Sequence, residues 1–392
     1  MKLFFAPLIA GFLILSSCKI TSSAYLFSLG EGPKEIYRDS IAFNREARLM
    51  IIPVTIGGET YRFLFDTGAP MVVSTELVEK LNLKRLTSKK VDDSQGKRER
   101  LDYVLLEALA INNKTFYDLT AIAADLKRAP AINCLNIDGI IGANLMRLAI
   151  WDIDYEHEVM HFTNDFENFT PDTLAHILPF TTKGTGTPVV TLVINGDTLT
   201  NITFDTGSAG ALSVYKKRMK DGNIQIEKVS YGYHSQGLFG STADTNFLAQ
   251  ASLSIGAKTL PLPVLNLETT KSKDLLGQRF FQDYRVVLNW QAKKAYLTPV
   301  KTPEPVKTLA ISPHLVGDKI FVGTLLFGSQ ADSLGIKPSD QILAVNDLNL
   351  EAVTIENYCK LLDLWRSDDP EIMVTIKGKE PFVLQEELLF AE

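Results

Sequence analysis

One short segment occurs twice in this chain, and its surroundings recur with it. The tetrapeptide Phe-Asp-Thr-Gly contains Asp66 in its first copy and Asp205 in its second, 139 residues later. Ahead of each aspartate lies an alternating strand pattern with a Gly-containing turn, in segments 54–59 and 192–197. This repeat constrains the fold more than composition does, because both copies must form the same supersecondary unit.

Features downstream of the aspartates repeat in the same order. A serine stands eight residues after each aspartate, a Ser-Gln-Gly sequence follows in both copies, and two apolar residues with a glycine come about 75 residues after each aspartate. The matched positions are Ser74 and Ser213, Ser94-Gln95-Gly96 and Ser235-Gln236-Gly237, and Ile140-Ile141-Gly142 and Leu275-Leu276-Gly277. Two similar lobes of about 120 residues each account for this order.

The residues between these markers predict a mainly β fold. Short runs rich in Val, Ile, Phe and Thr are separated by Gly, Asn and Asp turns, a pattern typical of small closed β-barrels. Segment 75–81 is the best helix candidate in the first copy. We predict a first lobe at 46–165, an inter-lobe linker at 166–180 and a second lobe at 181–300.

The order strand, Asp-Thr-Gly, hairpin, apolar-apolar-Gly resembles each half of the pepsin and retropepsin superfamily. It is most similar to bacterial aspartyl proteases that carry a C-terminal PDZ domain. The resemblance implies a bilobal aspartic endopeptidase that hydrolyses peptide or protein substrates and needs no metal or cofactor. In such an enzyme two carboxyl groups share one proton, so one can deprotonate water while the other donates a proton.

The same resemblance assigns roles to residues in both Asp-Thr-Gly loops. Asp66 and Asp205 take the catalytic positions, and the other residues hold the loops. The supporting residues are Thr67, Gly68, Thr206, Gly207, Ser208, Gly142 and Gly277. Ser208 replaces Ala69 at the corresponding position, and a hydroxyl donor favours the ionised form of a carboxyl group. We therefore expect Asp205 to be the more readily ionised aspartate and the pair to work nearer neutrality.

The two Ser-Gln-Gly segments are candidate flaps, hairpins that close over an extended substrate. The first flap contains Ser94, Gln95 and Gly96, and the second contains Ser235, Gln236 and Gly237. Neither has the Tyr-Gly pair of pepsin-type flaps at this position. The alternative function is an inert pair of barrels that binds peptides or proteins at the cell surface without cleaving them.

A second motif, His-Glu-Val-Met-His at 157–161, matches the H-E-x-x-H zinc signature. Zinc ligation by this motif requires a helix, because only there do histidines four residues apart share one face. The preceding segment 151–155 alternates as a strand, so we expect a strand here and no metal site. His176, His234 and His314 are expected to be ordinary surface or turn residues.

The N-terminus predicts export. Lys2 and the apolar run 3–15 resemble a secretory signal at 1–17, and the run is too short to span a bilayer. The sequence Leu-Ser-Ser-Cys ending at Cys18 resembles a bacterial lipobox, which implies a lipid-anchored protein with a tether at 18–45. We expect it in the periplasm or at the outer membrane of a Gram-negative bacterium. A plain signal peptide is the alternative.

Two cysteines remain after the lipobox. Cys134 and Cys359 fall in different predicted domains, so both are expected to be lone, buried thiols. A formal charge of -6 with mixed signs offers no basic surface for nucleic acid. Because both catalytic halves lie in one chain, we expect a monomer.

A polar linker at 301–308 precedes a predicted PDZ domain at 309–392, which would recruit substrate or regulate the enzyme. PDZ domains add a C-terminal peptide as an extra strand and hold its carboxylate in a Gly-rich loop. The residues expected in that loop are Leu309, Ala310, Ile311 and Ser312, and none is glycine. Peptide capture and a structural or autoregulatory role therefore both stay open.

Overall fold

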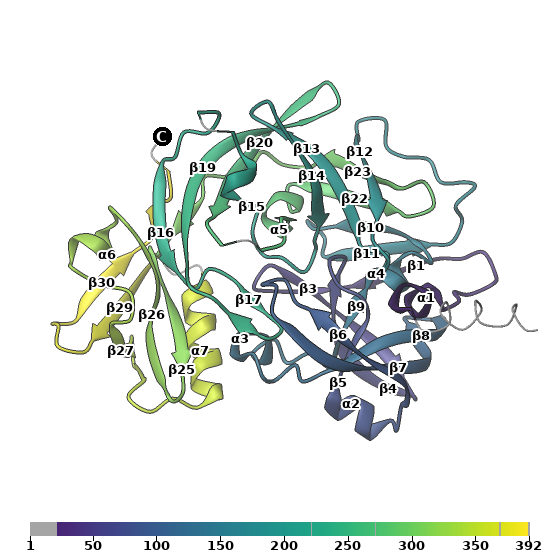
Figure 1. Ribbon diagram of the computed structural model, residues 1–392, viewed down its shortest axis with the longest axis horizontal. Coiled ribbons are helices and arrows are strands. Elements are labelled where there is room, and N and C mark those ends of the chain that lie inside the picture. The colour runs from purple at the N-terminus through teal and green to yellow at the C-terminus, as the bar shows by residue number, and fades with distance from the viewer. Residues whose placement is uncertain (1–21, 221, 271, 368–369, 391–392) are drawn as a thin grey trace, which may run out of the picture.

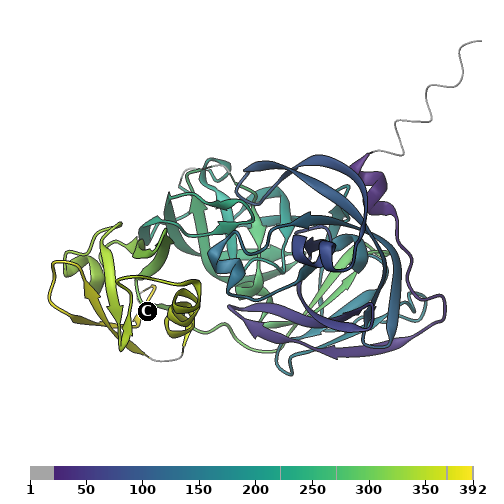
Figure 2. The ribbon, with the colours of Figure 1, turned by 90° about the horizontal axis from the view of Figure 1, so that it is seen from below.

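A computed structural model describes residues 22–392 except 221, 271, 368–369 and 391–392 (Figure 1). The predicted signal sequence and Cys18 lie outside the described residues. The fold is mainly β, as the sequence predicts. A large body contains both Asp-Thr-Gly loops, and a C-terminal unit built from residues 307–390 lies at one end of it (Figure 2).

The first half of the chain forms an eight-stranded sheet. Its strands are β2 (Asn44–Glu46), β3 (Leu49–Ile56), β4 (Glu59–Asp66), β5 (Val72–Ser74), β6 (Lys84–Asp92), β7 (Arg98–Ile111), β8 (Lys114–Ala124) and β9 (Gly139–Gly142). The order is β2-β3-β4-β9-β5-β8-β7-β6, and pairing of β3 with β7 curls the sheet on itself. Strand β4 ends at Asp66, so the sheet fixes the position of this carboxyl group.

Three short helices accompany this sheet. They are α2 (Thr75–Lys80), α3 (Pro130–Asn133) and α4 (Ala143–Met146). The predicted helix at 75–81 is confirmed as α2, which begins where the Ser74 hydroxyl accepts a hydrogen bond from the Leu77 N–H. Leu77 and Val78 are buried, and this apolar face holds α2 on the sheet.

The second half repeats this arrangement around Asp205. Its strands are β13 (Pro188–Ile194), β14 (Asp197–Phe204), β15 (Leu212–Tyr215), β16 (Lys228–Gly232), β17 (Gln236–Gly237), β18 (Gly240–Ser241), β19 (Asp244–Ile255), β20 (Lys258–Glu268) and β21 (Leu275–Leu276). Its helices are the 3-10 turn Lys216–Arg218 and α5 (Gln278–Phe281). Strand β21 runs parallel to β14 as β9 does to β4, so the two apolar-apolar-Gly segments occupy matching places.

Strands from both halves form one shared antiparallel sheet. Its pairings run β1-β11-β10-β22-β23-β12. These strands are β1 (Arg38–Ala42), β11 (Val159–Thr163), β10 (Ile150–Asp154), β22 (Tyr284–Asn289), β23 (Lys294–Pro299) and β12 (His176–Thr182). Beneath it one continuous core joins the halves, and Trp151 at its centre stacks on Phe162 with ring centroids 5.1 Å apart.

Two predicted linkers are wrong in part. The segment expected to be a tether contains α1 (Ser23–Ser28) and β1, and the segment expected to join the lobes contains the start of β12. Leu26 and Phe27 of α1 are buried, and the Leu26 carbonyl accepts a hydrogen bond from Thr120. These segments fold because they bury apolar side chains against strands that lie far away in the sequence.

The C-terminal unit has its own hydrophobic core. Its elements are β24 (Lys307–Thr308), β25 (Ile311–Val316), β26 (Lys319–Leu326), α6 (Gln330–Ser333), β27 (Gln341–Val345), β28 (Leu348–Asn349), α7 (Ile355–Arg366), β29 (Glu371–Ile376), β30 (Phe382–Gln385) and β31 (Glu387–Leu388). Thr354 caps α7, and Tyr358, Leu361 and Leu362 form its buried face. Strand β26 pairs with β16, which joins this unit to the second half of the body.

A disulfide joins the C-terminal unit to the first half of the body. Cys134 follows α3, Cys359 lies in α7, and their Cα atoms are 5.2 Å apart. The prediction of two lone thiols is therefore wrong. Pairing depends on the packing of α3 against α7, which a separation of 225 residues hides from sequence reasoning.

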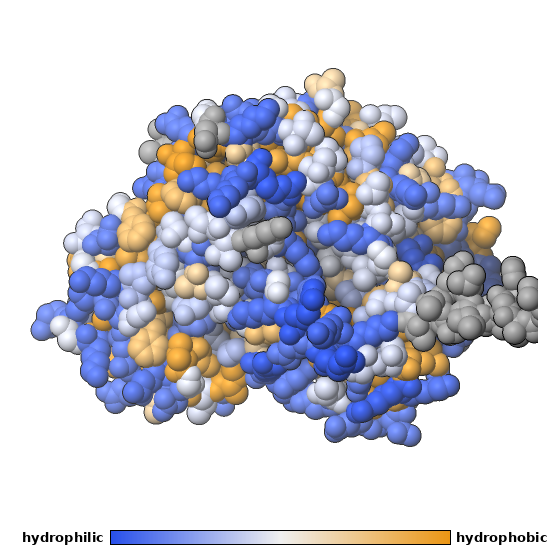
Figure 3. Space-filling view, viewed as in Figure 1, coloured by the Kyte–Doolittle hydropathy of each residue, from blue (hydrophilic) through white to orange (hydrophobic). Residues whose placement is uncertain are grey.

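The outer face shown in Figure 3 is mostly hydrophilic, with apolar residues in scattered groups. Among the described residues, none of the helices has the length and apolar character needed to cross a membrane.

Candidate active site

The two Asp-Thr-Gly loops meet at the centre of the body through their threonines. Each backbone N–H, of Thr67 and of Thr206, donates to the hydroxyl of the other threonine at 3.0 Å. Each hydroxyl then donates across the interface, from Thr67 to the Phe204 carbonyl at 2.5 Å and from Thr206 to the Phe65 carbonyl at 2.9 Å. Both threonines are fully buried, so this reciprocal network fixes the two loops relative to each other.

The network brings the two carboxyl groups together. Asp66 and Asp205 share a hydrogen bond between their side chains. A Cβ on Gly68 would lie 2.5 Å from the Asp205 carboxyl carbon, and one on Gly207 would lie 2.3 Å from that of Asp66. Both positions therefore require glycine, because any side chain there would displace the carboxyl group of the opposite loop.

Backbone amides approach both carboxyl groups. The Gly68 N–H donates to Asp66 Oδ1 at 2.7 Å, and the Gly207 N–H donates to Asp205 Oδ1 at 2.9 Å. A further backbone contact from Ala69 reaches Asp66 only. The Asp66 carboxylate thus receives more support from backbone dipoles than the Asp205 carboxylate does.

The pKa values of the two aspartates differ in the same sense. Burial raises the pKa of Asp66, whereas hydrogen bonds from Asp205 and the backbone amides oppose the rise. Burial and the neighbouring Asp66 charge hold the pKa of Asp205 well above its usual range. The cation of Lys273 lowers the pKa of both. Burial thus disfavours ionisation of both carboxyl groups at once, and the two aspartates hold one proton between them.

The expectation that Asp205 ionises first depended on a hydrogen bond from the Ser208 hydroxyl. In the described part of the chain the Ser208 hydroxyl makes no hydrogen bond with Asp205, so the donor on which that expectation depended is missing. Ser208 acts through its backbone carbonyl, which accepts the Gln278 N–H at 2.8 Å. It supports the loop without tuning the carboxyl group.

The glycines of the two apolar-apolar-Gly segments lie where they were expected, directly behind the loops. A Cβ on Gly142 would lie 2.0 Å from the Pro70 carbonyl carbon, and one on Gly277 would lie 2.6 Å from the Ser208 carbonyl oxygen. The backbone passes here too closely for any other residue.

Two buried amides that the sequence analysis missed complete this support. The Asn144 amide accepts the Met71 N–H at 2.7 Å and donates to the Thr120 carbonyl at 3.0 Å. The Gln278 amide donates to the Thr206 carbonyl at 2.7 Å. Both residues lie within two positions of a repeat glycine, which was the available signal.

The two candidate flaps meet each other. Ser94, Gln95 and Gly96 form the tip of the β6–β7 hairpin, and Ser235, Gln236 and Gly237 lie in or just before the β17–β18 hairpin. The Gln95 amide donates to the Ser235 hydroxyl at 2.7 Å. Asp93, which is buried, accepts the Phe239 N–H at 3.0 Å, and Lys97 donates to the Ser241 carbonyl at 2.9 Å.

A cleft of about 520 Å³ lies between these flaps and the aspartates. Asp66, Asp205 and Lys273 supply charged groups to it. Most of its remaining wall in the first half is apolar, formed by Leu49, Leu64, Val72, Ile122, Leu126, Leu135, Ile137 and Ile140. Such a wall binds aliphatic or aromatic side chains by removing them from water.

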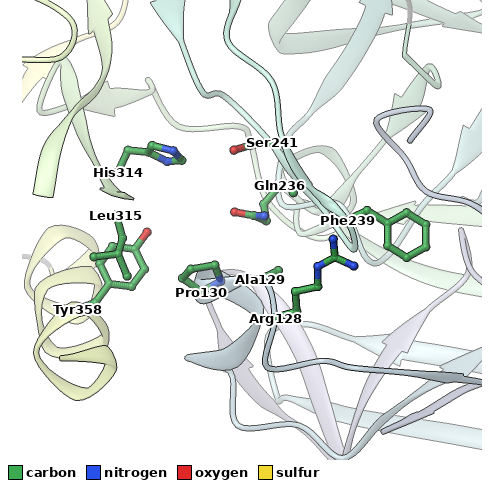
Figure 4. A pocket seen from close by; sticks show the side chains of 10 residues that line it. Arg128, Ala129, Pro130, Gln236, Phe239, Ser241, His314, Leu315 and Tyr358 are labelled. Carbon is green, nitrogen blue, oxygen red and sulfur yellow. The ribbon is translucent and has the colours of Figure 1, made fainter. Parts of the chain in front are cut away.

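A smaller cavity of about 170 Å³ lies where three parts of the chain meet (Figure 4). We call it the junction pocket. Its lining includes Pro130 of α3, Phe239 of the second flap, and His314 with Tyr358 of the C-terminal unit. His314 stacks on Tyr233 with ring centroids 3.9 Å apart. The second flap thus contacts both the first half and the C-terminal unit.

The histidines divide between confirmed and wrong expectations. Segment 157–161 is a turn followed by β11, so the strand prediction is confirmed and the H-E-x-x-H geometry is absent from this segment. His234 lies in the loop between β16 and β17, where it is half-buried and lines the cleft, and burial lowers its pKa to about 4. His314 is also more than a surface residue, since its ring stacks on Tyr233.

The residues predicted to hold a peptide carboxylate do not form an open loop. Leu309, Ala310 and Ile311 are buried in the core of the C-terminal unit, and the Ile311 carbonyl accepts the Trp365 indole N–H at 3.0 Å. The Ser312 hydroxyl pairs with that of Thr324 at 2.7 Å. These four residues serve packing.

Comparison with known families supports the assignment of the first half. The family described as aspartyl protease matches residues 52–145, which include Asp66 and the repeat glycine Gly142. The chain therefore contains an aspartyl protease domain, which suggests protease activity on peptide or protein substrates. A search of curated proteins found no match.

Proposed function

We propose that the chain is a bilobal aspartic endopeptidase in which each half supplies one lobe and one catalytic aspartate. The hydrogen bond between the Asp66 and Asp205 carboxyl groups, at the base of an apolar cleft, carries this proposal. Carboxyl groups held in such contact cannot both ionise at low cost, so they hold one proton between them. That proton is what acid–base hydrolysis of a peptide requires.

The reaction follows from the asymmetry of the pair. Ionised Asp66 accepts a proton from a water molecule as the water oxygen attacks the peptide carbonyl carbon. Protonated Asp205 donates its proton to the carbonyl oxygen, giving a neutral tetrahedral diol. Collapse of the diol breaks the C–N bond as the proton taken up by Asp66 passes to the leaving nitrogen, and a diol proton returns to Asp205. No covalent enzyme intermediate forms.

The flaps and the apolar wall indicate how substrate binds. An extended peptide fits beneath two hairpins that can offer backbone hydrogen bonds along its length. The apolar wall of the first lobe favours a large aliphatic or aromatic side chain next to the bond that is cleaved. Gln95 and Ser235 must separate to admit the chain, since they join the flap tips.

We also propose that the enzyme is exported and anchored through a lipid on Cys18. The disulfide between Cys134 and Cys359 supports an oxidising compartment. We propose the C-terminal unit as a PDZ-like module that regulates the enzyme or recruits substrate. Its pairing with β16 and its contact with the second flap favour regulation.

Cleavage of a mixed peptide library tests the proposal. The exported fragment beginning at Lys19 and its Asp66→Asn variant would be compared from acidic to neutral pH. Cleavage by the parent alone, with a large apolar residue next to the cut, is the expected result. Equal cleavage by both proteins would exclude Asp66 as a catalyst, and binding without cleavage would favour the inert peptide-binding protein.

A further inference from the structure

The turn of the second flap places an apolar side chain in the cleft. Leu238 and Phe239 form the turn between β17 and β18, and Leu238 is half-buried. Leu238 lines the cleft and packs against a group of buried apolar side chains of the first half. The members of this group that also line the cleft are Leu64, Val72, Ile122, Leu126, Leu135 and Ile137. Leu238 therefore contacts the same wall that an apolar side chain of a substrate would contact.

A buried carboxylate of the first flap binds this turn. Asp93 Oδ2 accepts the Phe239 N–H at 3.0 Å, while Asp93 Oδ1 accepts the N–H groups of Gln95 at 3.0 Å and Lys97 at 2.9 Å. A Cβ on Gly237 would lie 2.3 Å from Asp93 Oδ2, so only glycine allows the second flap to come this close. Asp93 thus shapes the tip of the first flap and holds the second flap through a charge-assisted hydrogen bond.

Two further contacts join the flaps on either side of Leu238. The Gln95 amide donates to the Ser235 hydroxyl at 2.7 Å, and the Lys97 ammonium group donates to the Ser241 carbonyl at 2.9 Å. We call the contacts of Asp93, Gln95 and Lys97 with the second flap the latch. Because the latch fixes the chain before and after Leu238, it keeps this side chain against the apolar wall.

The other acidic side chains beside the flaps are engaged within their own halves of the chain. The Asp92 carboxylate accepts hydrogen bonds from the Arg98 guanidinium group, and the Glu268 carboxyl group accepts one from the Ser272 hydroxyl. Among the described residues, Asp93 is therefore the acidic residue of the first flap that holds the second flap.

The residue types in the turn fit this contact. Two-residue hairpin turns favour Gly, Asn or Asp, and an apolar side chain at a hairpin tip is unfavourable when water surrounds it. Here Leu238 contacts the apolar wall, and Phe239 lines both the cleft and the junction pocket. Burial of these two side chains offsets the poor turn propensity of the pair.

We propose that Leu238 occupies the subsite for an apolar side chain of the substrate and that the latch holds it there until a peptide displaces it. The subsite then takes a branched aliphatic side chain of leucine size, because it already accommodates one. The apparent affinity for a peptide is reduced by the fraction of molecules in which the subsite is free. This inference rests on the proposed peptidase function, because it takes the cleft to be the peptide site.

Peptide binding to the Asp66→Asn protein tests whether Leu238 competes with the substrate or contacts it. Neutral peptides with Leu, Phe or Gly at one position would be compared by fluorescence anisotropy. Adding Leu238→Ala should tighten binding of the Leu peptide roughly 5- to 10-fold, because the competing side chain is removed. Leu174→Ala, which removes a 72% exposed leucine outside the cleft wall, should change nothing. Unchanged or weaker binding to Leu238→Ala, or a preference for the Phe peptide, would overturn the proposal.

Hydrogen exchange without peptide tests the latch separately from binding. Lys97→Met removes the contact with Ser241 and should accelerate exchange in segment 236–241 severalfold. Lys90→Met, at an exposed position on β6 of the same hairpin, is the matched control and should leave exchange unchanged. Equal exchange in Lys97→Met and the parent would overturn the latch. Faster exchange in Lys97→Met with no peptide bound by any variant would reject the peptidase function and retain the latch.

Discussion

The two flaps occupy matching places in the repeat, but they are supported differently. The first is a long hairpin, with β6 of 9 and β7 of 14 residues that pair along β6 with one register shift between Arg85 and Thr87. The second interrupts its hairpin with the small β17–β18 turn, and its strand β16 has only 5 residues. Strand β16 instead pairs with β26 of the C-terminal unit. The first flap is therefore self-supporting, whereas the second depends on a neighbouring unit.

This difference shows how a nearly symmetric pair of Asp-Thr-Gly loops can be combined with regulation that acts on one flap. The threonine network is the same from both sides. Among the described residues, backbone pairing and the His314–Tyr233 stack link the C-terminal unit to the second flap and not to the first. Movement of that unit would therefore act on the second flap through strand pairing, whereas it would reach the first half through the disulfide to α3.

The largest effect is expected from the disulfide. Replacing Cys134 and Cys359 by serine should lower the stability of the C-terminal unit by up to about 5 kcal/mol, because a cross-link over a long loop restricts the unfolded chain. Hydrogen exchange should then accelerate in 228–241 and stay unchanged in 84–98. Equal acceleration in both flaps would contradict the conclusion that the second flap depends on the C-terminal unit and the first does not.

The threonine network, unlike the flaps, should respond equally on both sides. Replacing either threonine should lower the free energy of unfolding by a similar amount. Thr67→Val and Thr206→Val each leave buried backbone groups without partners and should cost roughly 2–4 kcal/mol in the free energy of unfolding. Urea titration would measure both. Thr198→Val, at an exposed position on β14, serves as the control and should change stability by less than about 0.5 kcal/mol. A large difference between the two buried variants would show that the centre is not symmetric.

Replacing one aspartate of the pair should stabilise the protein. The folded state raises the pKa of Asp205, so the wild type loses stability as the pH rises from the usual Asp value towards the raised one. Asp205→Asn does not titrate, and it should gain on the order of 1–2 kcal/mol at pH ~7 and almost nothing at pH ~3. Thermal unfolding across this range would measure the difference. Lower stability of the variant at neutral pH would contradict the raised pKa.

The smallest effect concerns the flap tips. Gln95→Ala removes the contact with Ser235 and should change kcat/KM a few-fold, because one exposed hydrogen bond contributes roughly 0.5–1.5 kcal/mol. Gln236, its counterpart, donates only to the neighbouring Gly237 carbonyl at 3.4 Å. Gln236→Ala is thus the matched control, and an equal effect from both variants would mean that the bridge is unimportant.

The local features of the fold could be predicted from the sequence. Alternation and turn residues determine the β3–β4 and β13–β14 hairpins, and the repeat places Gly142 and Gly277 behind the loops. The disulfide could not be predicted, because it depends on how α3 packs against α7. Segment 38–42 was missed as a strand because Ile41 is its only buried residue.

The positively charged side chains that line the cleft also could not be predicted from the sequence. Lys273 and Arg366 carry no local motif, and they reach the cleft only through long-range folding. The expected order of ionisation depended on the Ser208 hydroxyl, which makes no hydrogen bond with Asp205 among the described residues. Backbone amides of Gly68 and Gly207, not a side-chain hydroxyl, donate to the two carboxyl groups.

The central claim is that Asp66 and Asp205 share one proton, and the pH dependence of turnover tests it most directly. With a peptide selected from the library, kcat/KM of the parent should follow a bell-shaped curve. Its acid limb reports ionisation of Asp66 and its alkaline limb reports loss of the Asp205 proton. Because burial raises both pKa values, activity should extend through weakly acidic pH, and either Asn variant should abolish it. Undiminished turnover in Asp66→Asn or in Asp205→Asn would contradict the account.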